Sequence, residues 1–103
     1  FMSNTYQIYL ISDSTGETLD RIFLAIKAQF ENIDYKINTY SFTRTENQIL
    51  KILNKAEKNN NSIILYSIVD SNLAKYLAKL LSTMEYKIIE LVFFSARDKI
   101  FKI

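Results

Sequence analysis

The stretch "YLISDSTGETLDRI", from Tyr9 to Ile22, joins an apolar run to a helical pattern through small and acidic residues. The apolar run lacks the strict alternation of a half-exposed strand, which is typical of a strand covered on both faces. After Gly16, the only glycine of the chain, apolar residues recur at spacings of three and four, as in an amphipathic helix. The stretch therefore predicts a buried strand, a polar loop and a helix.

The same order repeats along the rest of the chain. Strands are predicted over Tyr6–Ser12, Tyr35–Phe42, Ile63–Val69 and Tyr86–Val92. Helical stripes between them consist of Leu19, Ile22, Phe23, Ile26 and Phe30, then Ile49, Leu50, Ile52, Leu53 and Ala56, then Leu73, Tyr76, Leu77, Leu80 and Leu81. Strands that alternate with helices predict an α/β fold that is doubly wound, with a mainly parallel four-stranded sheet and helices on both faces.

Composition narrows the functions that are open to the chain. Its 103 residues correspond to one small domain. Cysteine and histidine are both absent, which excludes disulfides, thiolate nucleophiles, imidazole bases and zinc sites built from either residue. A net charge of +2 with dispersed lysines predicts no nucleic-acid partner. No apolar run is long enough to cross a membrane and no signal peptide is recognisable, so the expected location is cytoplasmic.

Three strand-to-helix loops carry the polar residues of interest. They read "SDSTGET" (Ser12–Thr18), "TRTEN" (Thr43–Asn47) and "VDSN" (Val69–Asn72). In a parallel sheet these loops share one edge, where ligands bind near the switch in strand order. Free N–H groups at the start of a helix, together with an arginine, suit a phosphate. The candidate site residues are Asp13, Ser14, Thr15, Gly16, Arg44, Thr45 and Asp70, and no metal site is predicted.

Helix capping is the competing explanation for most of these residues. Ser14 and Glu17 form an S-x-x-E capping box, and Thr45 and Gln48 form the equivalent T-x-x-Q. Asp70 is equally placed to cap the third helix. Asp13 is required by no neighbouring cap, yet a carboxylate at the end of a buried strand needs a partner or water. Ligand binding and capping both stay open at this point.

Three motifs occur in register: "IYLISDSTGET" (Ile8–Thr18), "FTRTENQ" (Phe42–Gln48) and "ILYSIVD" (Ile64–Asp70). Together they resemble the N-terminal part of the regulatory proteins of pyruvate, phosphate dikinase and phosphoenolpyruvate synthase. The resemblance implies a bifunctional serine/threonine kinase and pyrophosphorylase. Such an enzyme uses ADP to phosphorylate a threonine of its target, which inactivates the target. It uses inorganic phosphate to remove that group, which releases pyrophosphate.

The resemblance also implies what this chain lacks. Residues 3–92 would be the Rossmann-like N-terminal domain, and residues 93–103 a tail of uncertain structure. The family's nucleotide-binding P-loop lies further along a longer chain. Standard phosphate loops need more glycines than the single Gly16. The C-terminal P-loop kinase domain is therefore expected to be absent, and the chain to be inactive alone. The segment "YKIIELVFFSARDKIFKI" (Tyr86–Ile103) also departs from the family, since it contains neither proline nor glycine.

Roles for the first loop follow from the same resemblance. Asp13 would align a hydroxyl or a metal-bound group, Thr15 and the amides near Gly16 would hold phosphate oxygens, and Arg44 would neutralise developing charge. ADP and inorganic phosphate are the implied small-molecule partners. The implied protein partner is the dikinase or the synthase, and a homodimer stays open.

Two other functions remain open beside this one. Openings of the strand-D-S-T kind also occur in lipid-binding proteins of the DegV type, which would hold a fatty acid in an apolar pocket. A non-catalytic α/β interaction module is the third alternative, in which the tail Phe93–Ile103 would pack against another domain or subunit.

Overall fold

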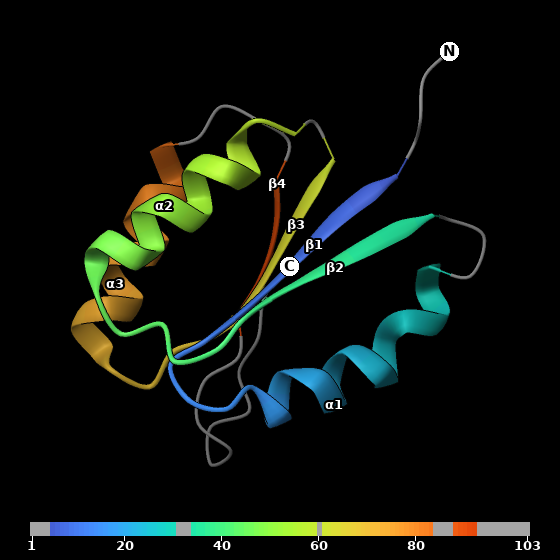
Figure 1. Cartoon of the computed structure of the whole chain (residues 1–103), viewed down its shortest axis with the longest axis horizontal. Helices are drawn as coiled ribbons and strands as arrows, with labels where there is room; N and C mark the ends of the chain where they lie inside the picture. Colours follow the sequence, from blue (N-terminus) through green and yellow to red (C-terminus); the bar gives the residue numbers. More distant parts are fainter. Residues whose placement is uncertain (1–4, 31–33, 60, 84–87, 93–103) are drawn as a thin grey trace.

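The computed structural model describes residues 5–30, 34–59, 61–83 and 88–92 and shows a parallel sheet between helices (Figure 1). Its strands are β1 (Tyr6–Ser12), β2 (Tyr35–Tyr40), β3 (Ser62–Ser67) and β4 (Ile88–Val92). Its helices are α1 (Glu17–Ile26), α2 (Glu46–Glu57) and α3 (Ser71–Thr83), and a 3₁₀ helix (Lys27–Phe30) follows α1. The predicted doubly wound α/β fold is confirmed. The predictions for the tail 93–103 and for the start of the fourth strand at Tyr86 lie outside the described residues.

The sheet has the strand order β2-β1-β3-β4, so β1 lies between two neighbours. Ile11 of β1 is in register with Tyr40 of β2 on one side and with Tyr66 of β3 on the other. All three strand pairs are parallel. The loops that follow the strands therefore lie at one edge of the sheet, as the sequence predicts.

Two apolar cores explain why β1 lacks simple alternation. Helix α1 covers one face of the sheet, and α2 and α3 cover the other (Figure 1). The first core consists of Ile8, Leu10, Leu19, Phe23, Ile63 and Leu65. The second consists of Tyr9, Ile11, Ile49, Ile52, Leu53, Ala56, Ile64, Tyr66, Ile68, Leu73, Leu77 and Leu81. Successive residues of β1 point to opposite faces, and both faces are buried.

Two strands end earlier than predicted, in each case because the chain turns to reach the loop after β1. β2 ends at Tyr40 and not at Phe42, whose N–H donates to the carbonyl of Ser14. β3 ends at Ser67 and not at Val69, whose N–H donates to the Asp13 carboxylate. These backbone donors leave the ladder for loop contacts, so the strand pattern stops.

The predicted α2 stripe contains one residue that the structure leaves exposed. Ile49, Ile52, Leu53 and Ala56 are buried, whereas Leu50 is 37% exposed. Leu50 was predicted as part of the stripe, but it lies about 100° around the helix from Ile49, beyond the sheet-facing side. Among the described residues, no helix combines the length and hydropathy that crossing a bilayer requires.

Candidate functional site

The candidate site lies where the connections from β1 and β3 diverge. From β1 the chain passes through α1 to β2, at one end of the strand order. From β3 it passes through α3 to β4, at the other end. This divergence is the switch point at which doubly wound folds bind ligands. The loops after β1, β2 and β3 are joined there by hydrogen bonds, described below.

Helix α1 begins without the predicted capping box. Gly16 is its N-cap residue, adopts φ 88°, and makes no side-chain capping bond. The Ser14–Glu17 box is therefore wrong. Ser14 is bonded to Ser12 instead: Ser12 Oγ accepts from the Ser14 N–H at 3.0 Å and contacts Ser14 Oγ at 3.2 Å. Only Thr15 Oγ1, at a long 3.4 Å, accepts from the Glu17 N–H.

The loop after β1 is bonded along its length to the loop after β2. Each carbonyl group of residues 12–15 accepts a hydrogen bond from a residue within 41–44. The bonds run from Thr43 N to Ser12 O (2.8 Å), Arg44 Nε to Asp13 O (3.1 Å), Phe42 N to Ser14 O (2.9 Å) and Ser41 Oγ to Thr15 O (3.0 Å). The acceptors of the first loop are therefore occupied. By contrast, the N–H groups of Thr18 and Leu19 have no acceptor within the part of the chain that the structure describes.

Arg44 adjoins this donor-rich loop, as the sequence predicts. Its Nε is held by the Asp13 carbonyl, and its guanidinium carbon lies 5.1 Å from the centre of the Phe42 ring. The terminal guanidinium nitrogens have no partner among the described residues, and the side chain is exposed. Two contacts thus orient a cation whose remaining donors are available to an anion.

Phe42 supports Arg44 from an unusual backbone conformation. Among the described residues, Phe42 is the non-glycine residue with a positive φ, which is 54°. Its side chain is 50% exposed. The left-handed region costs a bulky residue roughly 1 to 3 kcal/mol, and such strain concentrates at functional sites. The turn at Phe42 brings its own N–H and that of Thr43 onto the loop after β1.

Asp13 joins the loops after β1 and β3 across the switch point. Its Oδ2 accepts from the N–H groups of Val69 at 2.9 Å and Asp70 at 3.3 Å. These amides are the partner that a carboxylate at the end of a buried strand requires. Its Oδ1 makes no hydrogen bond within the described ranges and is open to a further donor.

Capping accounts for the other two predicted residues. Thr45 and Gln48 form the reciprocal capping box of α2, with the Gln48 N–H donating to Thr45 Oγ1 at 3.1 Å. Asp70 Oδ1 accepts from the Leu73 N–H at 2.9 Å at the start of α3. Both capping predictions are confirmed. The groups left for a ligand are Arg44, Thr15, Asp13 Oδ1 and the α1 amides.

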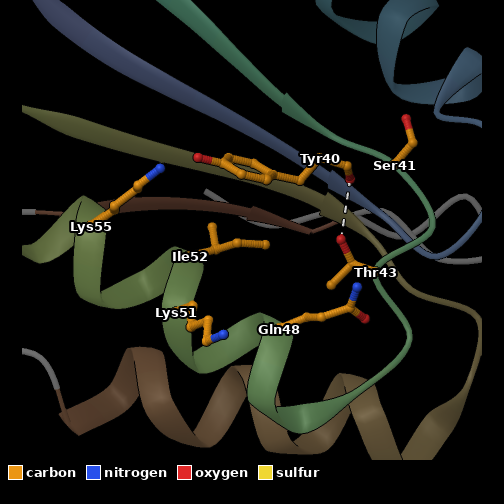
Figure 2. A pocket seen from close by; sticks show the side chains of 7 residues that line it. All are labelled: Tyr40, Ser41, Thr43, Gln48, Lys51, Ile52 and Lys55. Atoms are coloured by element: carbon orange, nitrogen blue, oxygen red, sulfur yellow. Dashed lines mark hydrogen bonds between the residues drawn. The ribbon is translucent and has the colours of Figure 1, made fainter.

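Sequence reasoning missed a cavity of about 330 Å³ beside this loop cluster, between β2 and α2 (Figure 2). Its lining residues are Tyr40, Ser41, Thr43, Gln48, Lys51, Ile52 and Lys55. The available signal was a pair of lysines one helical turn apart at the border of the apolar stripe. Across the described residues, no group of three or more acidic, histidine or cysteine side chains is arranged to hold a metal ion.

Comparisons with known proteins agree with the motifs in the loops. The family model described as kinase/pyrophosphorylase matches residues 8–97. A pyruvate, phosphate dikinase regulatory protein of Pelagibacter ubique is 74% identical over 77 residues, which are 75% of this chain and 28% of the relative. Proteins of the same name from Geotalea uraniireducens and Alkaliphilus oremlandii are 40% identical over 86 residues and 43% identical over 70 residues. These matches cover 84% and 68% of this chain, and 32% and 25% of the relatives, so the chain spans about a third or less of their length.

Proposed function

This chain belongs to the kinase/pyrophosphorylase family, and we propose that it forms the N-terminal part of a regulator of pyruvate, phosphate dikinase or phosphoenolpyruvate synthase. In the forward reaction a threonine hydroxyl of the target attacks the β-phosphoryl group of ADP, and AMP leaves. In the removal reaction an oxygen of inorganic phosphate attacks the phosphorus of the phosphothreonine, the bond to the threonine oxygen breaks, and pyrophosphate is released with the restored threonine hydroxyl. Both reactions place a phosphoryl group between an attacking and a leaving oxygen, and both depend on positioning and charge stabilisation.

The proposed role of this chain is to hold the phosphorylated threonine or the inorganic phosphate. The observation that carries this role is the loop after β1, whose carbonyls all bond to residues 41–44, whereas the Thr18 and Leu19 amides have no acceptor among the described residues. The start of α1 adds the positive end of the helix dipole. Arg44 would supply a charged donor, and Thr15 would supply its hydroxyl.

The target proposed for this site is a protein segment. Phe42 and Val69 flank the loop cluster with side chains that are 50% and 73% exposed. Both are tied by their N–H groups to the first loop, to Ser14 and Asp13 respectively. Apolar side chains beside an anion-binding loop suit a phosphorylated segment whose neighbouring residues also need contacts. The cavity beside the loops has lysines and polar side chains in its lining, which does not favour the DegV-type fatty-acid alternative.

An anion titration tests the proposed site. Inorganic phosphate, and a phosphothreonine peptide copied from the target, are titrated into the chain and into Arg44→Ala by calorimetry. Because Arg44 is exposed, we expect its loss to weaken phosphate binding by about 1 kcal/mol, or roughly fivefold. Arg21→Ala, an exposed arginine of α1, is the matched control and should bind as the parent does. Equal affinities in all three proteins would eliminate the shared site.

Nucleotide-dependent transfer is proposed to need more than this chain. ADP and inorganic phosphate stay the proposed substrates, but the chain has no glycine-rich loop to surround the phosphates of a nucleotide. Incubation of the purified chain with labelled ADP and the dikinase should leave the dikinase unlabelled. Transfer of label would contradict this expectation.

Cytoplasmic location and self-association stay predictions, which fractionation and sedimentation would test.

A further inference from the structure

The cavity between β2 and α2 has an apolar side. Ile52, only 5% exposed, comes from α2, and the ring of Tyr40 comes from the edge strand β2. Figure 2 shows the Tyr40 ring extending above Ile52. The volume of about 330 Å³ falls at the lower end of the range typical of small-molecule sites. This side of the cavity suits the carbon skeleton of a small ligand.

A second side of the cavity is cationic. Lys51 and Lys55 lie one turn apart on α2, and both line the cavity. Neither ammonium group pairs with a carboxylate in the described portion of the chain. Lys55 reaches toward the hydroxyl end of Tyr40 (Figure 2). Two unpaired ammonium groups at one mouth favour an anion, and lysine binds phosphate as a point charge.

The loop end of the cavity presents one hydrogen-bond acceptor and one donor. Thr43 Oγ1 donates to the Tyr40 carbonyl at 3.3 Å, whereas the Ser41 hydroxyl donates to the Thr15 carbonyl at 3.0 Å and points away from the cavity (Figure 2). The Thr43 hydroxyl has one proton, so its oxygen retains a lone pair for an incoming donor. Gln48 Oε1 accepts from backbone N–H groups of the α2 cap, which leaves its Nε2 free to donate. Figure 2 shows the amide of Gln48 turned toward Thr43.

We propose that this cavity is a second binding site, for an organic phosphate whose body carries hydroxyl groups. The lysines would hold the phosphate, Ile52 and Tyr40 would cover the carbon skeleton, and the loop end would accept from the hydroxyls. Ribose phosphate has this chemistry, either as a free sugar phosphate or as part of a mononucleotide. The site lies beside the Arg44 loop and shares Ser41 and Thr43 with it, but it does not rest on the function proposed for that loop.

The binding test uses the ¹⁵N-labelled chain and four probes: ribose 5-phosphate, adenosine monophosphate, ribose and inorganic phosphate. We expect ribose 5-phosphate to shift the amide signals of Ser41, Gln48 and Lys51, and ribose to bind far more weakly. Inorganic phosphate should shift the amides of Thr18 and Leu19, if the proposed loop site is correct, so each site is read from its own amide signals. Tighter binding of either ribose 5-phosphate or the mononucleotide identifies the source of the ligand. Equal binding of ribose and ribose 5-phosphate, or no shifts with either phosphate ester, would overturn the proposal.

A charge-matched pair of variants tests the lysines. Lys51→Gln/Lys55→Gln should weaken ribose 5-phosphate binding roughly tenfold, because two charge contacts are lost. Lys75→Gln/Lys79→Gln removes the same charge at the same spacing from exposed positions of α3 and should bind within about twofold of the parent. As a measurement that needs no variant, the parent affinity should fall as salt rises. An unchanged affinity in the first pair, or a salt-independent affinity, would overturn the proposal.

Discussion

The Asp13 carboxylate and the backbone N–H of Val69 are 2.9 Å apart, and this bond joins the loops after β1 and β3 at the switch point of the sheet. The same oxygen also accepts from the Asp70 N–H at 3.3 Å. Asp13 thus has a structural role in the arrangement of the site, whatever ligand its second oxygen contacts. The start of α3 is positioned through this bond, since Asp70 is also the residue that caps that helix.

Removal of this carboxylate should destabilise the fold. We expect Asp13→Ala to lower the free energy of unfolding by about 1 kcal/mol, because two N–H groups lose a charged acceptor in a partly exposed loop. Asp13→Asn should retain most of the stability, since an amide oxygen can still accept. Urea unfolding measures both, with Asp34→Ala, at an exposed position, as the control. The role assigned to Asp13 fails if Asp13→Ala costs no more than the control.

Substitutions in the two capping boxes that the sequence predicts should change the stability by different amounts. Thr45→Ala should cost about 1 kcal/mol, because it removes the acceptor for the Gln48 N–H. Ser14→Ala should cost little, because α1 receives no capping bond from Ser14. Chemical denaturation of both variants beside the parent gives the comparison. A larger loss in Ser14→Ala than in Thr45→Ala would contradict the assignment of the N-caps.

Local sequence determined much of the fold. Ile8 to Ile11 form an unbroken apolar run that indicates burial on both faces, and the structure divides these residues between two cores. The order of strands and helices then placed the three polar loops at one edge. The prediction that Arg44 would lie beside the first loop followed from that order alone, and the bond to the Asp13 carbonyl confirms it.

Contacts between distant segments determined what local patterns could not. The spacing of Ser14 and Glu17 matches a capping box, but Gly16 takes the N-cap position, and Ser14 is bonded to Ser12 and to the Phe42 N–H instead. The partner of Asp13 lies 56 residues along the chain, where no local rule can find it. The cavity beside β2 was missed because a helical stripe identifies the core-facing side only, whereas Lys51 and Lys55 border that stripe.

Gly16 should not tolerate a side chain. At φ 88° any L-residue is strained, and a Cβ would also lie 3.4 Å from Ser41 Oγ. We expect Gly16→Ala to cost about 1 to 2 kcal/mol, mainly through the backbone. The double variant Gly16→Ala/Ser41→Ala separates the two causes in thermal and urea unfolding. If the backbone dominates, the two losses should add within about 0.5 kcal/mol. Recovery of stability in the double variant would instead assign the cost to the Ser41 contact.

Tyr9 should make stability depend on alkaline pH. Its side chain is 3% exposed, and its hydroxyl accepts from Asn59 Nδ2 at 3.2 Å. Burial raises the pKa of Tyr9 above its ordinary value; the Asn59 bond opposes this shift, and the neighbouring Tyr40 adds to it. A raised pKa means that the folded chain holds the phenolic proton more tightly than the unfolded chain does. This contribution to stability is complete below the unfolded pKa of about 10 and is lost as the pH rises through that value toward the folded pKa.

Tyr9→Phe should therefore change the pH profile as well as the stability at neutral pH. At pH 7 we expect a loss of about 1 kcal/mol, because the Asn59 amide loses the nearer of its two acceptors. Above about pH 10 the free energy of unfolding should fall less steeply in the variant than in the parent, since one titrating group is gone. Urea unfolding at a series of pH values measures both effects, and Tyr76→Phe, on α3, controls for the loss of one hydroxyl. Parallel profiles for the parent and Tyr9→Phe above pH 10 would show that Tyr9 does not govern the alkaline loss of stability.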